Sequence, residues 1–245
     1  ASAGNQQDPL NVWDTSFQAV WHLKEATGVT NDDSTSNNHA GTPTNGPTTT
    51  TGKIGAAQNY DGTDDHTLPA GPWSLANSSF TVHAWINSAS LPPSGQDDWF
   101  GLKTSTSLQM KLHMAIMADG SIRFGFYNQD LDTGAGQIAA GQWYHVVSTY
   151  DSGTDTSTIY KNGAFVLSGT QGPFLGASPT GYLGWAGDGT VWFTGQLDEV
   201  RVSNIARSAA WVATEFNNQN NPSSFFSTGL EESTTPCTPT PTATN

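Results

Sequence analysis

Residues 192–203 read Trp192-Phe193-Thr194-Gly195-Gln196-Leu197-Asp198-Glu199-Val200-Arg201-Val202-Ser203 and are the most informative segment of this chain. Apolar residues alternate with polar ones up to Leu197, but they resume at Val200 with the opposite parity. Neighbouring side chains of a β-strand point to opposite faces, so a regular strand cannot accommodate this change. The sequence therefore predicts either a β-bulge at Asp198-Glu199 or an inward-turned Asp198 carboxylate with a compensating partner.

The composition favours one large all-β domain. A length of 245 residues lies within the range of a single β-sandwich. Apolar residues make up 35% of the chain and include nine Trp and eleven Phe, which is enough for a hydrophobic core. Gly, Thr, Ser and Asn are abundant, and they favour strands and turns. We therefore predict antiparallel strands rather than long helices.

The charge of the chain restricts its partners. The net charge is −13 and the pI is about 4.4, so phosphate backbones and anionic lipid surfaces are repelled. No apolar run approaches the roughly 20 residues that cross a bilayer. We predict no nucleic-acid partner and no membrane insertion. Ala1-Ser2-Ala3 suits the start of a mature chain after signal removal, so we expect a secreted or cell-surface protein.

Turn dipeptides predict two hairpins. Asp119-Gly120 and Asn162-Gly163 each connect two strand-forming segments, and both dipeptides readily adopt the positive φ angles of tight hairpin turns.

Residues 27–53 are rich in Thr, Asn, Gly and Pro and are predicted to be a long surface loop. Residues 208–217 are the one predicted helix, with Ser208 as its cap.

The ends of the chain differ from its centre. We predict a leader or linker over residues 1–11, the domain over residues 12–230 and a Thr/Pro-rich extended tail or linker over residues 231–245. Cys237 is the single cysteine and cannot form an internal disulfide. It is either an incidental free thiol or a cross-link to another chain.

Several segments in order resemble bacterial laminin-G-like domains of the concanavalin A-like jelly-roll type. Residues 193–202 look like the closing strand of such domains, and residues 19–23, 33–41, 80–86 and 141–147 match earlier parts. The resemblance implies an antiparallel two-sheet β-sandwich with one short C-terminal helix. In related bacterial proteins, a segment similar to Asn11-Val12-Trp13-Asp14 joins an upstream domain of unknown function to the jelly roll.

A structural calcium ion is also implied by this resemblance, because similar jelly rolls often hold calcium between an early loop and the closing strand. Calcium prefers carboxylate, carbonyl and amide oxygens. We predict that Asp33, Asn38 and Asp198 bind one calcium ion. The alternative is that the loop residues only cap turns.

Other catalytic and metal patterns are not apparent. The histidines stand apart in sequence without metal-ligand spacing, so no zinc site is expected, and residues 61–65 are predicted to be a solvated acidic turn. Jelly-roll glycoside hydrolases carry Glu-x-Asp-x-Glu on one strand, which this chain lacks. The nearest pair, Asp130 and Asp132, lies in a predicted loop. We therefore expect no enzyme, and a glycoside hydrolase is the weaker alternative.

Exposed aromatic side chains stack against the apolar faces of sugar rings, and nearby carboxylates accept hydrogen bonds from their hydroxyls. We predict that six residues form a carbohydrate-binding surface: Asp97, Asp98, Trp99, Trp185, Asp188 and Trp192. The alternative is that the three tryptophans pack in the core or at a sheet edge.

We expect a secreted, non-catalytic recognition or adhesion module whose partner is a glycan or surface polysaccharide. The alternative from another class is a structural subunit of an extracellular filament or surface layer, in which copies of the chain join through their terminal segments.

Overall fold

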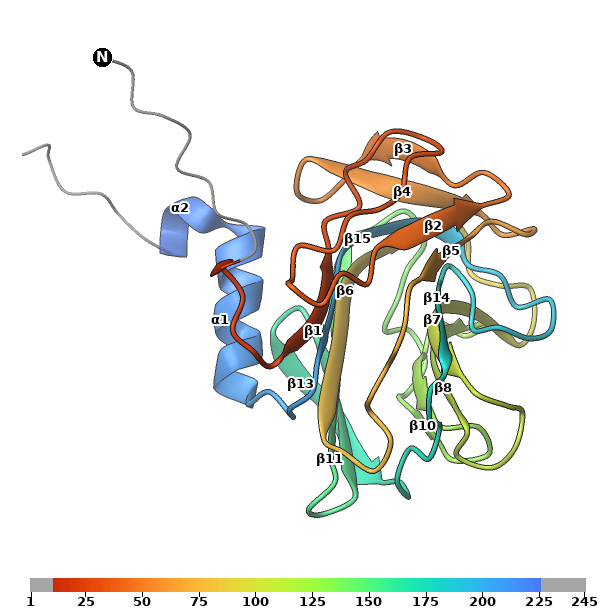
Figure 1. Cartoon of the computed structure of the whole chain (residues 1–245), viewed down its shortest axis with the longest axis vertical. Coiled ribbons are helices and arrows are strands. Elements are labelled where there is room, and N and C mark those ends of the chain that lie inside the picture. Colours follow the sequence, from red (N-terminus) through yellow and green to blue (C-terminus); the bar gives the residue numbers. More distant parts are fainter. Residues whose placement is uncertain (1–10, 226–245) are drawn as a thin grey trace, which may run out of the picture.

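Two antiparallel sheets packed face to face form the computed structural model, which describes residues 11–225 (Figure 1). The eight-stranded sheet has the order β13-β12-β11-β6-β15-β4-β3, with β1 also beside β15, and the seven-stranded sheet has the order β10-β9-β8-β7-β14-β5-β2. The predicted antiparallel β-sandwich is confirmed. The elements are β1 (Phe17–Trp21), β2 (Gly41–Thr44), β3 (Thr48–Thr51), β4 (Ala56–Asp61), β5 (His66–Pro69), β6 (Phe80–Ser88), β7 (Gln96–Lys103), β8 (Lys111–Met117), β9 (Ile122–Gly125), β10 (Asp130–Asp132), β11 (Tyr144–Asp151), β12 (Thr156–Lys161), β13 (Ala164–Thr170), β14 (Thr180–Leu183), β15 (Thr194–Ser203), α1 (Ala209–Asn220) and α2 (Pro222–Phe225).

Three of the predictions concern residues that the structure does not describe. The tail, Cys237 and nearly all of the leader lie outside the described residues.

Strand β15 lies in the middle of the eight-stranded sheet. It pairs with β6 on one side, and on the other side with β4 along its first half and β1 along its second half. The register with β6 shifts between Asp198 and Arg201, and Glu199 has a φ angle of 51°. The predicted β-bulge is therefore confirmed, and it explains why the apolar parity changes at Val200.

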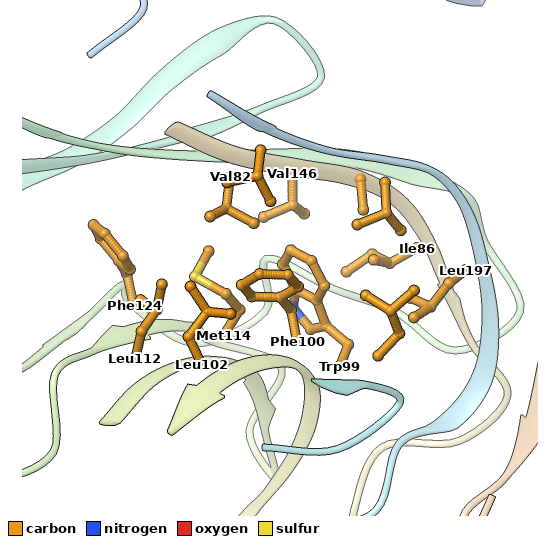
Figure 2. Packing of buried hydrophobic residues seen from close by; sticks show 14 of the residues in the cluster. Val82, Ile86, Trp99, Phe100, Leu102, Leu112, Met114, Phe124, Val146 and Leu197 are labelled. Carbon is orange, nitrogen blue, oxygen red and sulfur yellow. The ribbon is translucent and has the colours of Figure 1, made fainter. Parts of the chain in front are cut away.

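The core lies between the two sheets, and Figure 2 shows their inner faces meeting. All of its central side chains are fully buried, which is expected to supply most of the stabilisation of the sandwich. Those from the eight-stranded sheet include Val82, Ile86, Val146 and Leu197, and those from the seven-stranded sheet include Trp99, Phe100, Leu102, Leu112, Met114 and Phe124.

Two loop predictions are wrong. Residues 27–53 contain β2 and β3, which add an edge strand to each sheet. Asp130 and Asp132 lie in the short edge strand β10, not in a loop.

Both predicted hairpins are confirmed, as β8–β9 and β12–β13. The helix begins after Ser208 as predicted, but it continues to Asn220.

Helix α1 covers the outer face of the eight-stranded sheet (Figure 1). Val212 of the helix packs against Val147 and Tyr160, and the Trp85 indole Nε1 donates a hydrogen bond to Gln219 Oε1 at 2.5 Å. Within residues 11–225, no helix covers the outer face of the seven-stranded sheet. None of the helices in this range is both long and apolar enough to cross a membrane.

Candidate functional site

Trp99 is a core residue, which corrects its predicted place in a carbohydrate-binding surface. It lies in β7 and is fully buried. The register between β7 and β8 shifts between Asp98 and Phe100, so a bulge at Trp99 lets both aromatic rings face the core. A side chain in this position cannot contact a ligand at the surface.

Trp185 and Trp192 are brought together by the connection between β14 and β15. Their indole rings stack with centroids 4.1 Å apart and an interplanar angle of 21°. His66 lies 5.5 Å from each of them, and Tyr182 packs edge-on against Trp185 at 5.1 Å. Both tryptophans are half-buried, so part of each indole faces solvent. The four rings form one aromatic cluster on the outer face of the seven-stranded sheet.

Lys111 connects two of the predicted carboxylates beside this cluster. Its Nζ lies 2.5 Å from Asp188 Oδ1 and 3.3 Å from Asp98 Oδ2. Burial raises the pKa of Asp98, and the charges of Lys111 and His113 oppose this shift. Because Lys111 pairs with both carboxylates, Asp98 and Asp188 are held in place by this cation and are less available to accept hydrogen bonds from a ligand.

Arg123 extends the polar network along the sheet. Its guanidinium donates to Asp132 at 2.7 and 2.6 Å and to Gln96 Oε1 at 2.7 Å, and Gln96 Nε2 donates to Asp98. The sequence reasoning missed Lys111 and Arg123. Each is a charged residue in a strand, but its partners come from other segments, which local sequence patterns do not identify.

A pocket of about 430 Å³ opens beside Trp192, between the loop that precedes β7 and the connection that precedes β15. Its wall includes Pro92, Pro93, Gln96, Asp97 and Trp192. The structure thus brings together Asp97 and Trp192, two of the residues predicted to bind a ligand. The volume is within the range of small-ligand sites.

Among the residues that line this pocket, Asp97 alone has a titratable side chain. Burial raises its pKa to about 6, and the charge of Asp98 adds to the shift, while hydrogen bonds from Thr194 oppose it. The folded protein therefore binds more protons than the unfolded chain between about pH 4 and pH 6, so this group lowers the stability as the pH rises through that range.

We expect Asp97→Asn to remove this pH dependence. The difference in free energy of unfolding, variant minus unmodified protein, should become more positive by about 1–3 kcal/mol as the pH rises from 4 to 7. Urea unfolding at several pH values measures the difference. Asp32→Asn, which changes an exposed aspartate, is the control. A constant difference between Asp97→Asn and the unmodified protein would contradict the expectation.

The residues predicted to bind calcium lie in two surroundings. Asp33 and Asn38 line a pocket of about 260 Å³ together with Asp32 and Glu25. Asp198 is not among the residues lining that pocket, and its carboxylate accepts a hydrogen bond from the Ile54 backbone at 2.8 Å. Burial raises the pKa of Asp198 to about 7. Calcium binding by these residues stays a prediction.

Several solved structures share the fold. Domain 4 of AbnA, a GH43 extracellular arabinanase from Geobacillus stearothermophilus solved with arabinotriose, has a TM-score of 0.63 at 21% identity, and the match covers 81% of this chain and 97% of that chain. The binding domain of Paraclostridial Mosquitocidal Protein 1 has a TM-score of 0.68 at 16% identity, with 84% and 53% covered. Trypanosoma rangeli sialidase, solved with 2,3-difluorosialic acid, has a TM-score of 0.64 at 16% identity, with 86% and 34% covered.

These matches show a common fold and no more, because the same fold supports many functions. The chain spans about half of the binding domain of the mosquitocidal protein and about a third of the sialidase chain. No curated protein matches the sequence significantly. Residues 60–213, more than half of the chain, match the laminin-G-type family described as the concanavalin A-like lectin/glucanases superfamily. The chain therefore belongs to the concanavalin A-like lectin/glucanases superfamily.

Proposed function

We propose that this domain is a non-catalytic carbohydrate-binding module that acts in recognition or adhesion outside the cell. The observation that carries the proposal is the pocket beside Trp192. The Trp192 indole stacks on Trp185, so the two rings form one aromatic surface next to the pocket. Tryptophan rings bind the C–H faces of sugars, and Asp97 in the same wall supplies a carboxylate for sugar hydroxyls.

The arrangement of carboxylates supports binding rather than hydrolysis. Glycoside hydrolysis requires an acid and a second carboxylate on either side of the scissile bond. Along the outer face of the seven-stranded sheet, Asp98 and Asp188 share Lys111, and Asp130 and Asp132 both contact Arg123. Each pair is thus neutralised in part by a cation that lies between its members.

The charge of the protein favours a neutral sugar. The net charge of −13 and the carboxylate of Asp97 in the pocket wall disfavour an anionic ligand such as sialic acid. Among the similar structures, domain 4 of the arabinanase was solved with arabinotriose, a neutral oligosaccharide. That arabinanase is an extracellular enzyme, which supports a location outside the cell for this domain.

The test is isothermal titration calorimetry of the full chain with a panel of neutral oligosaccharides that includes arabinotriose, and with sialic acid for comparison. We expect Trp192→Ala to weaken binding of a neutral sugar roughly tenfold or more, which is a loss of about 1.4 kcal/mol. Trp185→Ala should act in the same direction, because it removes the ring that supports Trp192.

Trp143→Ala is the matched control, since Trp143 is a half-buried tryptophan outside the site. It should leave sugar binding unchanged. Equal binding by Trp192→Ala and Trp143→Ala would contradict the proposed site, as would a complete lack of binding across the panel. Sugar release from any panel member would contradict a non-catalytic role.

A structural subunit is the second candidate, and the edge strand β13 favours it. This strand ends the eight-stranded sheet, and its side chains are exposed or half-exposed, including Phe165 at 60%. An open edge of this kind accepts a further strand from another copy. Electron microscopy that shows regular filaments, lost in a Phe165→Lys variant, would favour this candidate over a discrete binding module.

A further inference from the structure

Three metal-binding side chains meet between the eight-stranded sheet and α1. His83 of β6 and His145 of β11 are fully buried on neighbouring strands, and Glu215 of α1 is 8% exposed. One ligand atom from each residue lies within 4.8 Å of the other two. His83 Nδ1 and Glu215 Oε2 lie 3.4 Å apart.

Five polar atoms of these side chains lack a hydrogen-bond partner within the described part of the chain. Both ring nitrogens of His83 and both of His145 are unpaired, and so is Glu215 Oε2. Buried polar atoms are nearly always satisfied, because desolvating them without a partner costs about 1–3 kcal/mol each. Several unpaired atoms of metal-ligating groups that face one another therefore indicate a shared partner.

We infer that His83, His145 and Glu215 bind a divalent transition-metal ion, for which zinc is the best match. Two imidazoles and one carboxylate are a frequent zinc donor set. Zinc bonds of about 2.0–2.2 Å place tetrahedral ligand atoms about 3.3 Å apart, so small side-chain rotations bring these atoms into range. A neutral imidazole keeps one ring nitrogen lone pair that can bind a metal ion.

The neighbouring charges position the carboxylate. Glu215 Oε1 accepts a hydrogen bond from Arg201 at 2.5 Å and another from Gln219 at 3.1 Å, which leaves Oε2 facing His83. Arg201 also pairs with Glu199, so two carboxylates surround one guanidinium. Arg207, the other nearby cation, is paired with Asp14. The charges of Arg201 and Arg207 oppose a cation beside His83, and the carboxylates paired with these arginines offset part of this repulsion.

The spacing of histidines along the chain gave no indication of this site. His83 and His145 are 62 positions apart in sequence, yet pairing of β6 with β11 aligns His83 with Val147 and His145 with Trp85. The two histidines therefore share the outer face of the sheet, and the covering helix supplies the third group. A bound metal would join α1 to two strands.

The first experiment uses the unmodified full chain after treatment with a chelator and dialysis. Titration with zinc should show one ion per chain by calorimetry and by elemental analysis after gel filtration, with a rise in melting temperature. Cobalt in place of zinc should give the visible absorption of a tetrahedral nitrogen and oxygen site. No retained metal and no thermal shift would overturn the inference.

Variants then locate the ion. His145→Gln and Glu215→Gln should each weaken zinc binding roughly tenfold or more, while His66→Gln on the other sheet should not. Asp64→Asn is the second control, because Asp61, Asp64 and Asp65 are the other group of three potential ligands in the described residues. Zinc binding that is lost in Asp64→Asn and kept in His145→Gln would overturn the assignment.

Imidazole NMR signals of the unmodified protein give an independent readout where a variant fails to fold. Zinc should shift the signals of the two buried rings. Shifts confined to exposed histidines would again overturn the inference.

Discussion

Asp33→Ala should lower the free energy of unfolding by about 3–5 kcal/mol. The Asp33 carboxylate accepts backbone N–H hydrogen bonds from Val20, Thr35 and His39 at 2.8–2.9 Å, and a further one from the Thr35 hydroxyl at 2.9 Å. Alanine would leave these donors without a partner in a site that is only 9% exposed. Each unpaired buried donor costs about 1–3 kcal/mol, and water admitted to the site offsets part of the sum. Chemical unfolding at pH 7 measures the loss.

Asp32→Ala is the matched control, since Asp32 is the exposed neighbour of Asp33. It should change the free energy of unfolding by less than about 0.5 kcal/mol. Asp33→Ala also tests the calcium prediction. If calcium binds through Asp33, adding calcium should raise the melting temperature of the unmodified protein but not that of Asp33→Ala. Equal stability of both variants would contradict the proposed role of the carboxylate.

Trp99→Ala should destabilise the domain by about 3–5 kcal/mol, because it opens a large cavity between the sheets. Trp99 is fully buried next to Phe100, and Figure 2 shows its ring among the core side chains. The loss should appear as a lower denaturant midpoint with cooperative unfolding retained.

Trp99→Phe separates packing from ligand binding. The indole Nε1 of Trp99 has no hydrogen-bond partner among the described residues, so phenylalanine loses volume but no hydrogen bond. This variant should cost much less than alanine and should bind sugars as the unmodified protein does. Reduced sugar binding by a fully folded Trp99→Phe protein would return this residue to the binding site.

The central elements of the fold were predictable because their signals are local. The change of parity after Leu197 indicates the bulge of β15, and Asp119-Gly120 and Asn162-Gly163 indicate two hairpins. Strands β2 and β3 were missed because their residues, Gly41–Thr44 and Thr48–Thr51, carry few apolar side chains. They are edge strands, so backbone pairing with β5 and β4 determines their conformation more than their own side chains do.

The site was predictable only in part. Trp185 and Trp192 were both predicted for the site, and the connection between β14 and β15 carries both. Trp99 was misplaced although the signal that revealed the bulge of β15 is also present there. Trp99 and Phe100 are consecutive large apolar residues, and both can face the core only if the strand is bulged. Lys111 and the pair His83 and His145 depend on which strands become neighbours, which local patterns do not encode.

The position of β15 also constrains the order in which the domain can be assembled. Its three partners, β1, β4 and β6, are all synthesised before it, and β1 is separated from it by most of the domain. Until residues 194–203 emerge from the ribosome, the partners have open edges where β15 belongs, and such edges promote aggregation. The eight-stranded sheet therefore closes late, through long-range contacts that are slow to form. A chain truncated before residue 194 lacks the strand that joins these partners into one sheet.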